Sequence, residues 1–282
     1  MHSLNRGLVL GGGGLVGTAW MAGLACGLRR DGVDLGEADL IVGTSAGAMV
    51  GVMLTTGRDL EQLAASPVRP AGPRPESDAG MGAVLAVLRE PGLDPAEVRR
   101  RFGRIALDTT DPETEETLLA IRRDLIGTEA WPDVRLLITA VDAATGEPVF
   151  WDRDSGIPLV HAVTASSAFP GVAPPIAIQG RRYMDGGVRS GTNADLAAGA
   201  RRLVVVEPLA HMSPREALEG ELAAVGAHTV VTISPDEASL RAFGSGLFDA
   251  AAWEPAYRAG LRQAGETAER LRSMWRAAAD TR

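Results

Sequence analysis

The chain has 282 residues, of which 45% are hydrophobic and 23% are charged, and this composition is typical of a folded protein with a sizeable core. All 28 basic residues are arginine and the formal net charge is −8, which argues against a nucleic-acid-binding protein that depends on counterion release from phosphates. The sequence contains no apolar stretch of about 18 residues, so we expect no transmembrane helix.

The cysteine content and the N-terminal sequence bear on the cellular location. The single cysteine, Cys26, excludes an intrachain disulfide, as is usual in a reducing compartment. Residues 6–26 resemble a signal peptide ending in Leu-Ala-Cys, but four consecutive glycines interrupt the apolar run. We therefore expect a cytoplasmic protein. Transient contact with a membrane surface stays open, because a small apolar surface can bind lipid without net positive charge.

The N-terminal part of the chain predicts alternating strands and helices. Two short apolar runs that end in glycine or next to it, Gly7–Leu10 and Ala38–Gly43, predict buried strands. A helix is predicted after each of them, over Thr18–Arg30 and Ala46–Leu54. This alternation predicts a parallel sheet covered by helices, and thus an α/β fold.

The remainder of the chain continues this mixture of elements. Residues 66–80 are rich in Pro and Gly and predict a loop, for which a lid over a lipid site and a plain surface loop are the two interpretations. Further helices are predicted over residues 80–89, 94–101, 112–126, 157–166 and 255–279. Further strands are predicted over residues 134–141, 148–151, 181–184, 203–207 and 229–234. Because no internal repeat or clean boundary is visible, we expect a single domain over residues 1–282.

The first of three glycine-marked turns is LGGGGLVG, residues 10–17. Glycines expose backbone N–H groups, and a helix start behind them favours negative charge. Gly12, Gly14 and Gly17 match the spacing of the dinucleotide-binding fingerprint, although the next predicted strand lacks a C-terminal acidic residue to hold a ribose. An oxyanion hole and a tight turn without a ligand are the other two interpretations.

The second turn is GTSAG, which places Ser45 between Gly43 and Gly47 where a predicted strand meets a predicted helix. A serine on such a turn is held out at the carboxyl edge of the sheet as a nucleophile. The alternative is that Ser45 serves only as the N-cap of the following helix.

The third turn is MDGG, in which Asp185 precedes Gly186 and Gly187 at the end of a predicted strand. An aspartate there is either a plain turn residue or a proton acceptor for a nucleophile. No histidine has a sequence setting that suggests a general base, so a Ser-Asp-His triad is poorly supported. The histidines are His2, His161, His211 and His228.

Taken together, the stretches LGGGGLVG, IVGTSAG and AVTASSAFPGVAPPIAIQGRRYMDGG resemble the patatin-like phospholipase family in their order and spacing. The resemblance covers roughly residues 6–207. It implies a three-layer α/β/α sandwich with a mainly parallel central sheet, on which a C-terminal strand and long helix within 229–279 would pack.

The resemblance also implies a serine acyl hydrolase that acts through a Ser-Asp dyad. Ser45 corresponds to the nucleophile and Asp185 to its base, and the oxyanion hole corresponds to the N–H groups of Gly12, Gly13 and Gly14. The glycines that support these turns are Gly17, Gly43, Gly47, Gly186 and Gly187. An ordinary aspartate, with a pKa of about 4, is a poor base at neutral pH, so we expect burial to raise the pKa of Asp185.

One position departs from the family pattern. The family often carries Arg or Lys before the last glycine of the first turn, where this chain has Val16. The substitution weakens the case for a phosphate headgroup, so we expect hydrolysis of lipid esters in general. Acyl transfer and a non-catalytic nucleotide-binding or regulatory module are the alternatives. We expect a lipid or other ester as the partner and neither a cofactor nor a metal, because no residue cluster has metal-ligand spacing.

Overall fold

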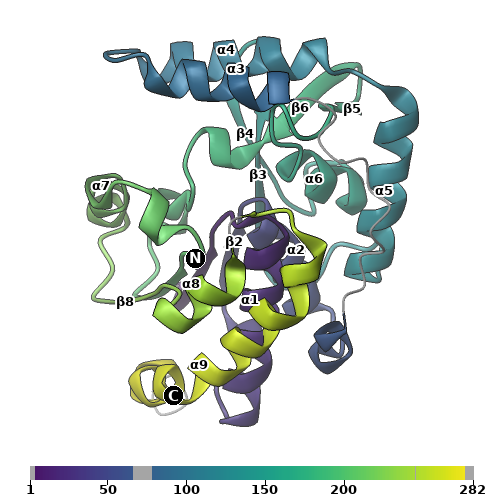
Figure 1. Ribbon diagram of the computed structural model, residues 1–282. Coiled ribbons are helices and arrows are strands. Elements are labelled where there is room, and N and C mark those ends of the chain that lie inside the picture. Colours follow the sequence, from purple (N-terminus) through teal and green to yellow (C-terminus); the bar gives the residue numbers. More distant parts are fainter. Residues whose placement is uncertain (1–3, 66–77, 245, 277–282) are drawn as a thin grey trace.

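The computed structural model describes residues 4–65, 78–244 and 246–276, and its centre is an eight-stranded sheet (Figure 1). The strand order is β5-β6-β3-β2-β1-β7-β8, with β4 paired to β3. The strands are β1 (Arg6–Leu10), β2 (Leu40–Gly43), β3 (Arg135–Asp142), β4 (Pro148–Trp151), β5 (Ile176–Ile178), β6 (Arg181–Asp185), β7 (Arg202–Val206) and β8 (Thr229–Ile233). Strands β3, β2, β1, β7 and β8 run parallel, and β4, β5 and β6 add antiparallel pairs. The predicted α/β fold with a mainly parallel sheet is confirmed.

Helices cover both faces of this sheet. They are α1 (Gly14–Arg30), α2 (Ala46–Thr55), α3 (Asp78–Arg89), α4 (Pro95–Asp108), α5 (Pro112–Ile126), α6 (Leu159–Ser166), α7 (Arg215–Val225), α8 (Glu237–Phe243) and α9 (Trp253–Arg276). Alternate residues of β1 face opposite sides, as the strand pleat requires. Leu8 and Leu10 belong to the core that includes α1, α2 and α9, whereas Val9 belongs to a second core with Leu218 of α7. The α/β/α sandwich follows from this two-sided burial.

The long C-terminal helix α9 crosses α1 (Figure 1). The two helices approach closely because each has a glycine at the crossing. A Cβ atom at Gly23 would collide with the carbonyl oxygen of Tyr257, and one at Gly260 would collide with that of Trp20. The side chains of Trp20 and Tyr257 are buried around this crossing, so it contributes substantially to the larger core.

Several elements differ from the sequence-based prediction. Helix α1 begins at Gly14 rather than Thr18, because the glycine turn itself forms the first helical turn. Helix α4 continues to Asp108 rather than ending at Arg101. Strand β5 and helices α7 and α8 were not predicted. Helix α3 begins at Asp78 rather than Gly80, so residues 78 and 79 of the predicted loop are helical. The rest of that loop, 66–77, for which a lid was one interpretation, lies outside the described residues. The single-domain organisation stays a prediction.

The order in which the chain adds strands to the sheet reverses between β1 and β7. From β1 the chain proceeds to β2 and β3 on one side, and later it adds β7 and β8 on the other side. In open α/β sheets, ligands bind in the crevice outside the carboxyl ends of the strands at such a reversal. The residues that follow β1, β2 and β7 here are Gly11, Thr44 and Glu207. Among the helices described, none is long and apolar enough to cross a membrane.

Candidate active site

Ser45 lies on a sharp turn between the end of β2 and the start of α2. Its φ of 55° and ψ of −115° place a non-glycine residue in a sparsely populated region, at a cost of about 1–3 kcal/mol. The flanking glycines make this turn possible. A Cβ atom at Gly47 would collide with the carbonyl oxygen of Leu10, and one at Gly43 would lie 2.7 Å from the Cα of Ala48. The turn therefore has no room for a side chain at either glycine.

The hydroxyl of Ser45 does not cap the helix that follows it. Its side chain makes no hydrogen bond to the N-terminus of α2, so the N-cap interpretation is wrong. Instead, Ser45 Oγ donates to Asp185 Oδ2 at 2.7 Å. This hydrogen bond joins the second and third glycine-marked turns and is consistent with a Ser-Asp dyad.

Asp185 ends β6 in a buried position, with 3% of its surface exposed. Burial raises its pKa to about 7, and this effect outweighs the opposing hydrogen bonds from Ser45 and from the N–H of Gly187 and the charge of Arg122. The predicted burial and raised pKa are confirmed. A carboxyl group with a pKa near 7 exists in both protonation states at neutral pH, which suits a group that accepts and returns a proton.

The two glycines after Asp185 allow the strand to turn within a crowded interior. The N–H of Gly187 donates to Asp185 Oδ1 at 2.7 Å, which fixes the orientation of the carboxylate. A Cβ atom at Gly186 would collide with the hydroxyl of Thr139 on β3. Gly187 therefore holds the carboxylate by its N–H, and Gly186 allows the strand end to lie close to β3.

Ser166, at the end of α6, holds the backbone of Ser45 by a hydrogen bond. The backbone N–H of Ser45 donates to Ser166 Oγ at 2.9 Å, and Ser166 is fully buried. Ser166 was not among the candidate site residues that the sequence indicated. The available signal was a hydroxyl side chain at the buried end of an apolar helix, where it needs a hydrogen-bond partner.

Arg122 on α5 brings a positive charge close to Asp185, a role that no sequence pattern indicated. Its Nε donates to Ser167 Oγ at 3.1 Å. Loss of solvation lowers the pKa of the guanidinium to about 10, so it stays charged at neutral pH. That charge favours the ionised form of Asp185 and lowers its pKa.

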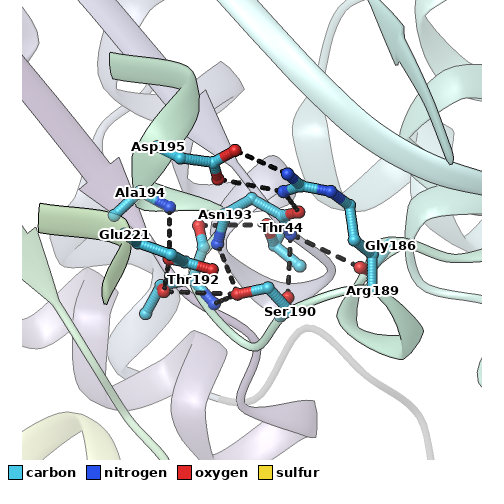
Figure 2. A network of polar contacts seen from close by, with 9 residues as sticks. All are labelled: Thr44, Gly186, Arg189, Ser190, Thr192, Asn193, Ala194, Asp195 and Glu221. Carbon is cyan, nitrogen blue, oxygen red and sulfur yellow. Dashed lines mark hydrogen bonds and ion pairs between the residues drawn. The ribbon is translucent and has the colours of Figure 1, made fainter. Parts of the chain in front are cut away.

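A buried asparagine links the two dyad turns, as Figure 2 shows. Asn193 is fully buried and adopts a left-handed conformation with φ of 54°. Its Nδ2 lies 3.0 Å from Thr44 Oγ1 and 2.8 Å from the carbonyl oxygen of Ser190, with a longer contact of 3.4 Å to that of Gly186. Its Oδ1 accepts from Arg189 at 2.6 Å. Thr44 precedes Ser45 and Gly186 follows Asp185, so Asn193 connects the two turns.

The glycine turn after β1 lies beside Ser45. A Cβ atom at Gly12 would lie 3.7 Å from the Cβ of Ser45. The N–H of Gly12 already donates to the carbonyl oxygen of Gly191 at 2.9 Å. The N–H groups of Gly13 and Gly14 have no acceptor within the part of the chain that the structure describes. Of the three amides implied by the family resemblance, these two are available for an oxyanion.

The first amides of α1 are occupied by a residue from far along the chain. The carbonyl oxygen of Leu247 accepts from the N–H groups of Leu15 at 2.8 Å and Val16 at 3.3 Å. In the dinucleotide fingerprint, a phosphate would occupy this position. The contact therefore disfavours the nucleotide interpretation of the glycine turn. The side chain of Val16 is fully buried, so a basic side chain there would lie in the apolar core.

No described histidine is hydrogen-bonded to Ser45 or to Asp185. His211 and His228 are exposed, His161 lies on α6, and His2 falls outside the described residues. Across the described ranges, no group of three or more His, Cys, Asp or Glu side chains could hold a metal ion.

Comparisons with known proteins agree with this architecture. The chain is 31% identical over 199 residues to uncharacterised NTE family proteins of Mycobacterium tuberculosis and Mycobacterium bovis, a match that covers 67% of this chain. It spans about half, 46%, of the length of those relatives. The crystal structure of VipD from Legionella pneumophila superposes with a TM-score of 0.51 at 13% identity, covering 95% of this chain and 67% of VipD, and supports the fold alone.

The family profile described as patatin-like phospholipase matches residues 8–198, which contain all three glycine-marked turns. Because this match covers more than half of the chain, it agrees with the sequence resemblance over the same region. The chain belongs to the patatin-like phospholipase family, a family of carboxylic ester hydrolases.

Proposed function

We propose that this protein hydrolyses carboxylic esters of lipids through a Ser45–Asp185 dyad and an acyl-serine intermediate. The observation that carries the proposal is the 2.7 Å hydrogen bond from Ser45 Oγ to a buried carboxylate. Family membership implies a lipid substrate. The strained backbone of Ser45 supports the same conclusion, because such strain persists mainly at functional sites.

In the first half of the reaction, Ser45 Oγ attacks the ester carbonyl carbon while its proton moves to Asp185 Oδ2. The negative charge that develops on the carbonyl oxygen is stabilised by the N–H groups of Gly13 and Gly14. The tetrahedral intermediate collapses as the bond to the alcohol oxygen breaks. Asp185 returns the proton to that oxygen, which leaves an acyl group on Ser45 and a free alcohol.

In the second half, water attacks the acyl carbon and transfers a proton to Asp185. Collapse of this second intermediate breaks the bond to Ser45 Oγ, which recovers its proton from Asp185, and the carboxylic acid departs. Acyl transfer would follow the same path with another alcohol in place of water. The unoccupied N–H groups and the strained serine support catalysis over a non-catalytic binding role.

The test compares wild type with Ser45→Ala and Asp185→Asn on p-nitrophenyl esters of several chain lengths, together with fluorophosphonate labelling. We expect wild type to be labelled and active, Ser45→Ala to be unlabelled, and Asp185→Asn to retain at most about 1% of kcat/KM. Ser273→Ala, an exposed serine on α9, is the matched control and should keep full activity. A folded wild type that is neither labelled nor active would refute the proposal. Free fatty acid released without an added alcohol identifies hydrolysis rather than transfer.

A further inference from the structure

Helix α3 is apolar on all sides over most of its length, although it lies at the edge of the molecule (Figure 1). Nine consecutive residues, 80–88, carry no polar side chain. A helix that is hydrophobic all round is normally buried, whereas a helix on the surface of a protein has a polar outer face. The sequence of α3 therefore indicates that its outer face is covered by an apolar partner.

The inner face of α3 packs on the next helix, α4, and the two form the α3–α4 hairpin. Val84 is buried in a small core together with Phe102 and Ala106 of α4. Met81 and Val87 pack against the same core. This packing accounts for only one side of α3.

The outer face of α3 is open to solvent. Leu85 is 40% exposed and Leu88 is 60% exposed, and Gly82 and Ala86 are exposed as well. Positions 82, 85 and 86 have the spacing of one helix face, and Leu88 lies one turn beyond Leu85. Of the six large hydrophobic residues that are exposed in the described part of the chain, two lie on this one helix. The exposed apolar surface is therefore concentrated here, as at an interaction site.

Guanidinium groups gather at the end of α3 that carries Leu88. The arginines of this cluster are Arg89, Arg100, Arg101 and Arg104. The last three pair with a single carboxylate, that of Glu97, and Arg101 also pairs with Glu90, the residue after α3. Four guanidinium groups thus share two carboxylates. The cluster is positively charged, although the formal net charge of the chain is −8.

The α3–α4 hairpin is also connected to the dyad. The ring of Phe102 on α4 packs edge to face on that of Phe169, with 6.4 Å between the centroids. The preceding residue, Ala168, accepts a hydrogen bond from the N–H of Asp185 at 3.0 Å. A surface bound by the hairpin would therefore lie near the proposed reaction centre.

We propose that the α3–α4 hairpin docks on an anionic lipid surface, with Leu85 and Leu88 among the acyl chains and Arg100 and Arg104 against the headgroups. The inference deepens the proposed function, on which it rests, because it names the surface from which the ester is taken. Apolar side chains flanked by arginines are typical of helices that lie in a membrane interface, and anionic lipids attract each nearby arginine. Lipid is favoured over a second copy of the chain, since two copies meeting through this face would bring two positive clusters to one interface.

The experiment measures binding to vesicles by flotation, with Ser45→Ala as the parent protein so that hydrolysis does not change the lipid. Vesicles of phosphatidylcholine mixed with phosphatidylglycerol are compared with vesicles of phosphatidylcholine alone. Leu85→Gln/Leu88→Gln removes the exposed apolar side chains of α3. Met212→Gln/Val230→Gln, at positions that are 62% and 36% exposed on other elements, is the matched control.

The contribution of charge is measured in the same way. Arg100→Gln/Arg104→Gln removes two exposed guanidinium groups of the cluster. Arg241→Gln/Arg258→Gln is the matched control, because these exposed arginines lie on α8 and α9 and each pairs with a glutamate four residues earlier.

We expect the parent protein to bind the anionic vesicles at low salt and to bind the neutral vesicles about tenfold more weakly. Leu85→Gln/Leu88→Gln should lower the partition coefficient about tenfold or more, because less apolar surface leaves water. Arg100→Gln/Arg104→Gln should lower it about tenfold on anionic vesicles, and high salt should have a similar effect. Both control variants should stay within about twofold of the parent.

Three outcomes would overturn the docking surface. They are a parent protein that binds neither vesicle, leucine variants that bind as well as their control, and a lipid-free dimer that dissociates in Leu85→Gln/Leu88→Gln. The dimer, detected by sedimentation, would assign the face to a second copy. Vesicle binding in the expected pattern by a protein that hydrolyses no ester would refute the proposed function and leave the docking surface standing. Hydrolysis of soluble esters without vesicle binding would refute the docking surface alone.

Discussion

The two sides of the site differ in how completely their polar groups are paired. On the side of β2 and β6, Ser45 has a partner for both its hydroxyl and its N–H, and both oxygens of Asp185 accept hydrogen bonds. On the side of β1 and β7, the N–H groups of Gly13 and Gly14 have no acceptor among the described residues. The paired side is fixed before any ligand arrives, as preorganised chemistry requires, while the unpaired side has groups left to bind one.

The largest effect should follow from removing the charge on the paired side. Asp185→Asn keeps the shape of the side chain but cannot accept a proton, so kcat should fall about 10²–10⁴-fold. The variant should also unfold at a higher temperature than wild type at pH 8. Burial raises the folded-state pKa to about 7, so wild-type stability falls as pH rises from the unfolded pKa of about 4 through 7, and asparagine lacks this loss.

Calorimetry at pH 8 with Asp124→Asn, at an exposed position of α5, provides the control for this experiment. A lower melting temperature for Asp185→Asn at pH 8 would show that the carboxylate stabilises the fold, which contradicts the raised pKa.

A smaller effect should come from adding a side chain to the turn that carries Ser45. Gly47→Ala places a methyl group against the carbonyl oxygen of Leu10 and should destabilise the protein by about 3 kcal/mol. On the side of β1 and β7, a Cβ atom at Gly220 of α7 meets nothing within 4 Å. Gly220→Ala should therefore stabilise by about 0.5–1 kcal/mol. Urea denaturation measures the free energy of unfolding of both variants. Similar changes in the two variants would contradict the contrast in packing between the two sides.

Asn193 gives an intermediate case, because it connects both dyad turns without touching the reacting atoms. Asn193→Gly removes the amide and tolerates the left-handed backbone, whereas Asn193→Ala also strains it. We expect kcat to fall about tenfold in both variants with KM little changed. Asn193→Ala should in addition be about 1 kcal/mol less stable than Asn193→Gly. Wild-type kcat in the glycine variant would mean that Asn193 has only a structural role.

The smallest effect should appear in the pH profile. Since Asp185 acts as a base only when ionised, kcat should rise as pH increases through about 7. Arg122 lowers the pKa of Asp185, so Arg122→Gln should move the profile to higher pH by less than about 1 pH unit. Arg123→Gln makes the same change in charge on the same helix, at a residue paired with Glu129, and should leave the profile in place. A shift toward lower pH would contradict the electrostatic role.

The sequence predicts elements well where local signals are strong. Helix α5 has the predicted bounds because Asp111 caps its start, Pro112 occupies its first turn and Gly127 ends it in a left-handed conformation. Strand β5 was missed because it has only three residues, and α7 because it follows a proline and buries few side chains. These elements form by packing onto the rest of the protein, which a local pattern does not report.

The residues of the candidate site also differ in whether a local sequence pattern reveals them. Ser45 and Asp185 lie in turns with marked glycine patterns and could be recognised. Ser166 is 121 positions from Ser45, and Asn193 is 149 positions from Thr44, so their roles depend on tertiary contacts. The glycine turn was recognisable, but the sequence could not show which of its N–H groups are free. The N–H of Gly12 donates to the carbonyl oxygen of Gly191, which lies in a distant loop.

The carbonyl oxygen of Leu247 on the first turn of α1 has a consequence for protein synthesis. The glycines of the proposed oxyanion site are made before Leu247, which occupies the neighbouring amides and lies more than two hundred positions later. Helix α9, which packs against α1, follows later still. The glycine turn of a nascent chain therefore reaches its final surroundings only after Leu247 and α9 have emerged from the ribosome.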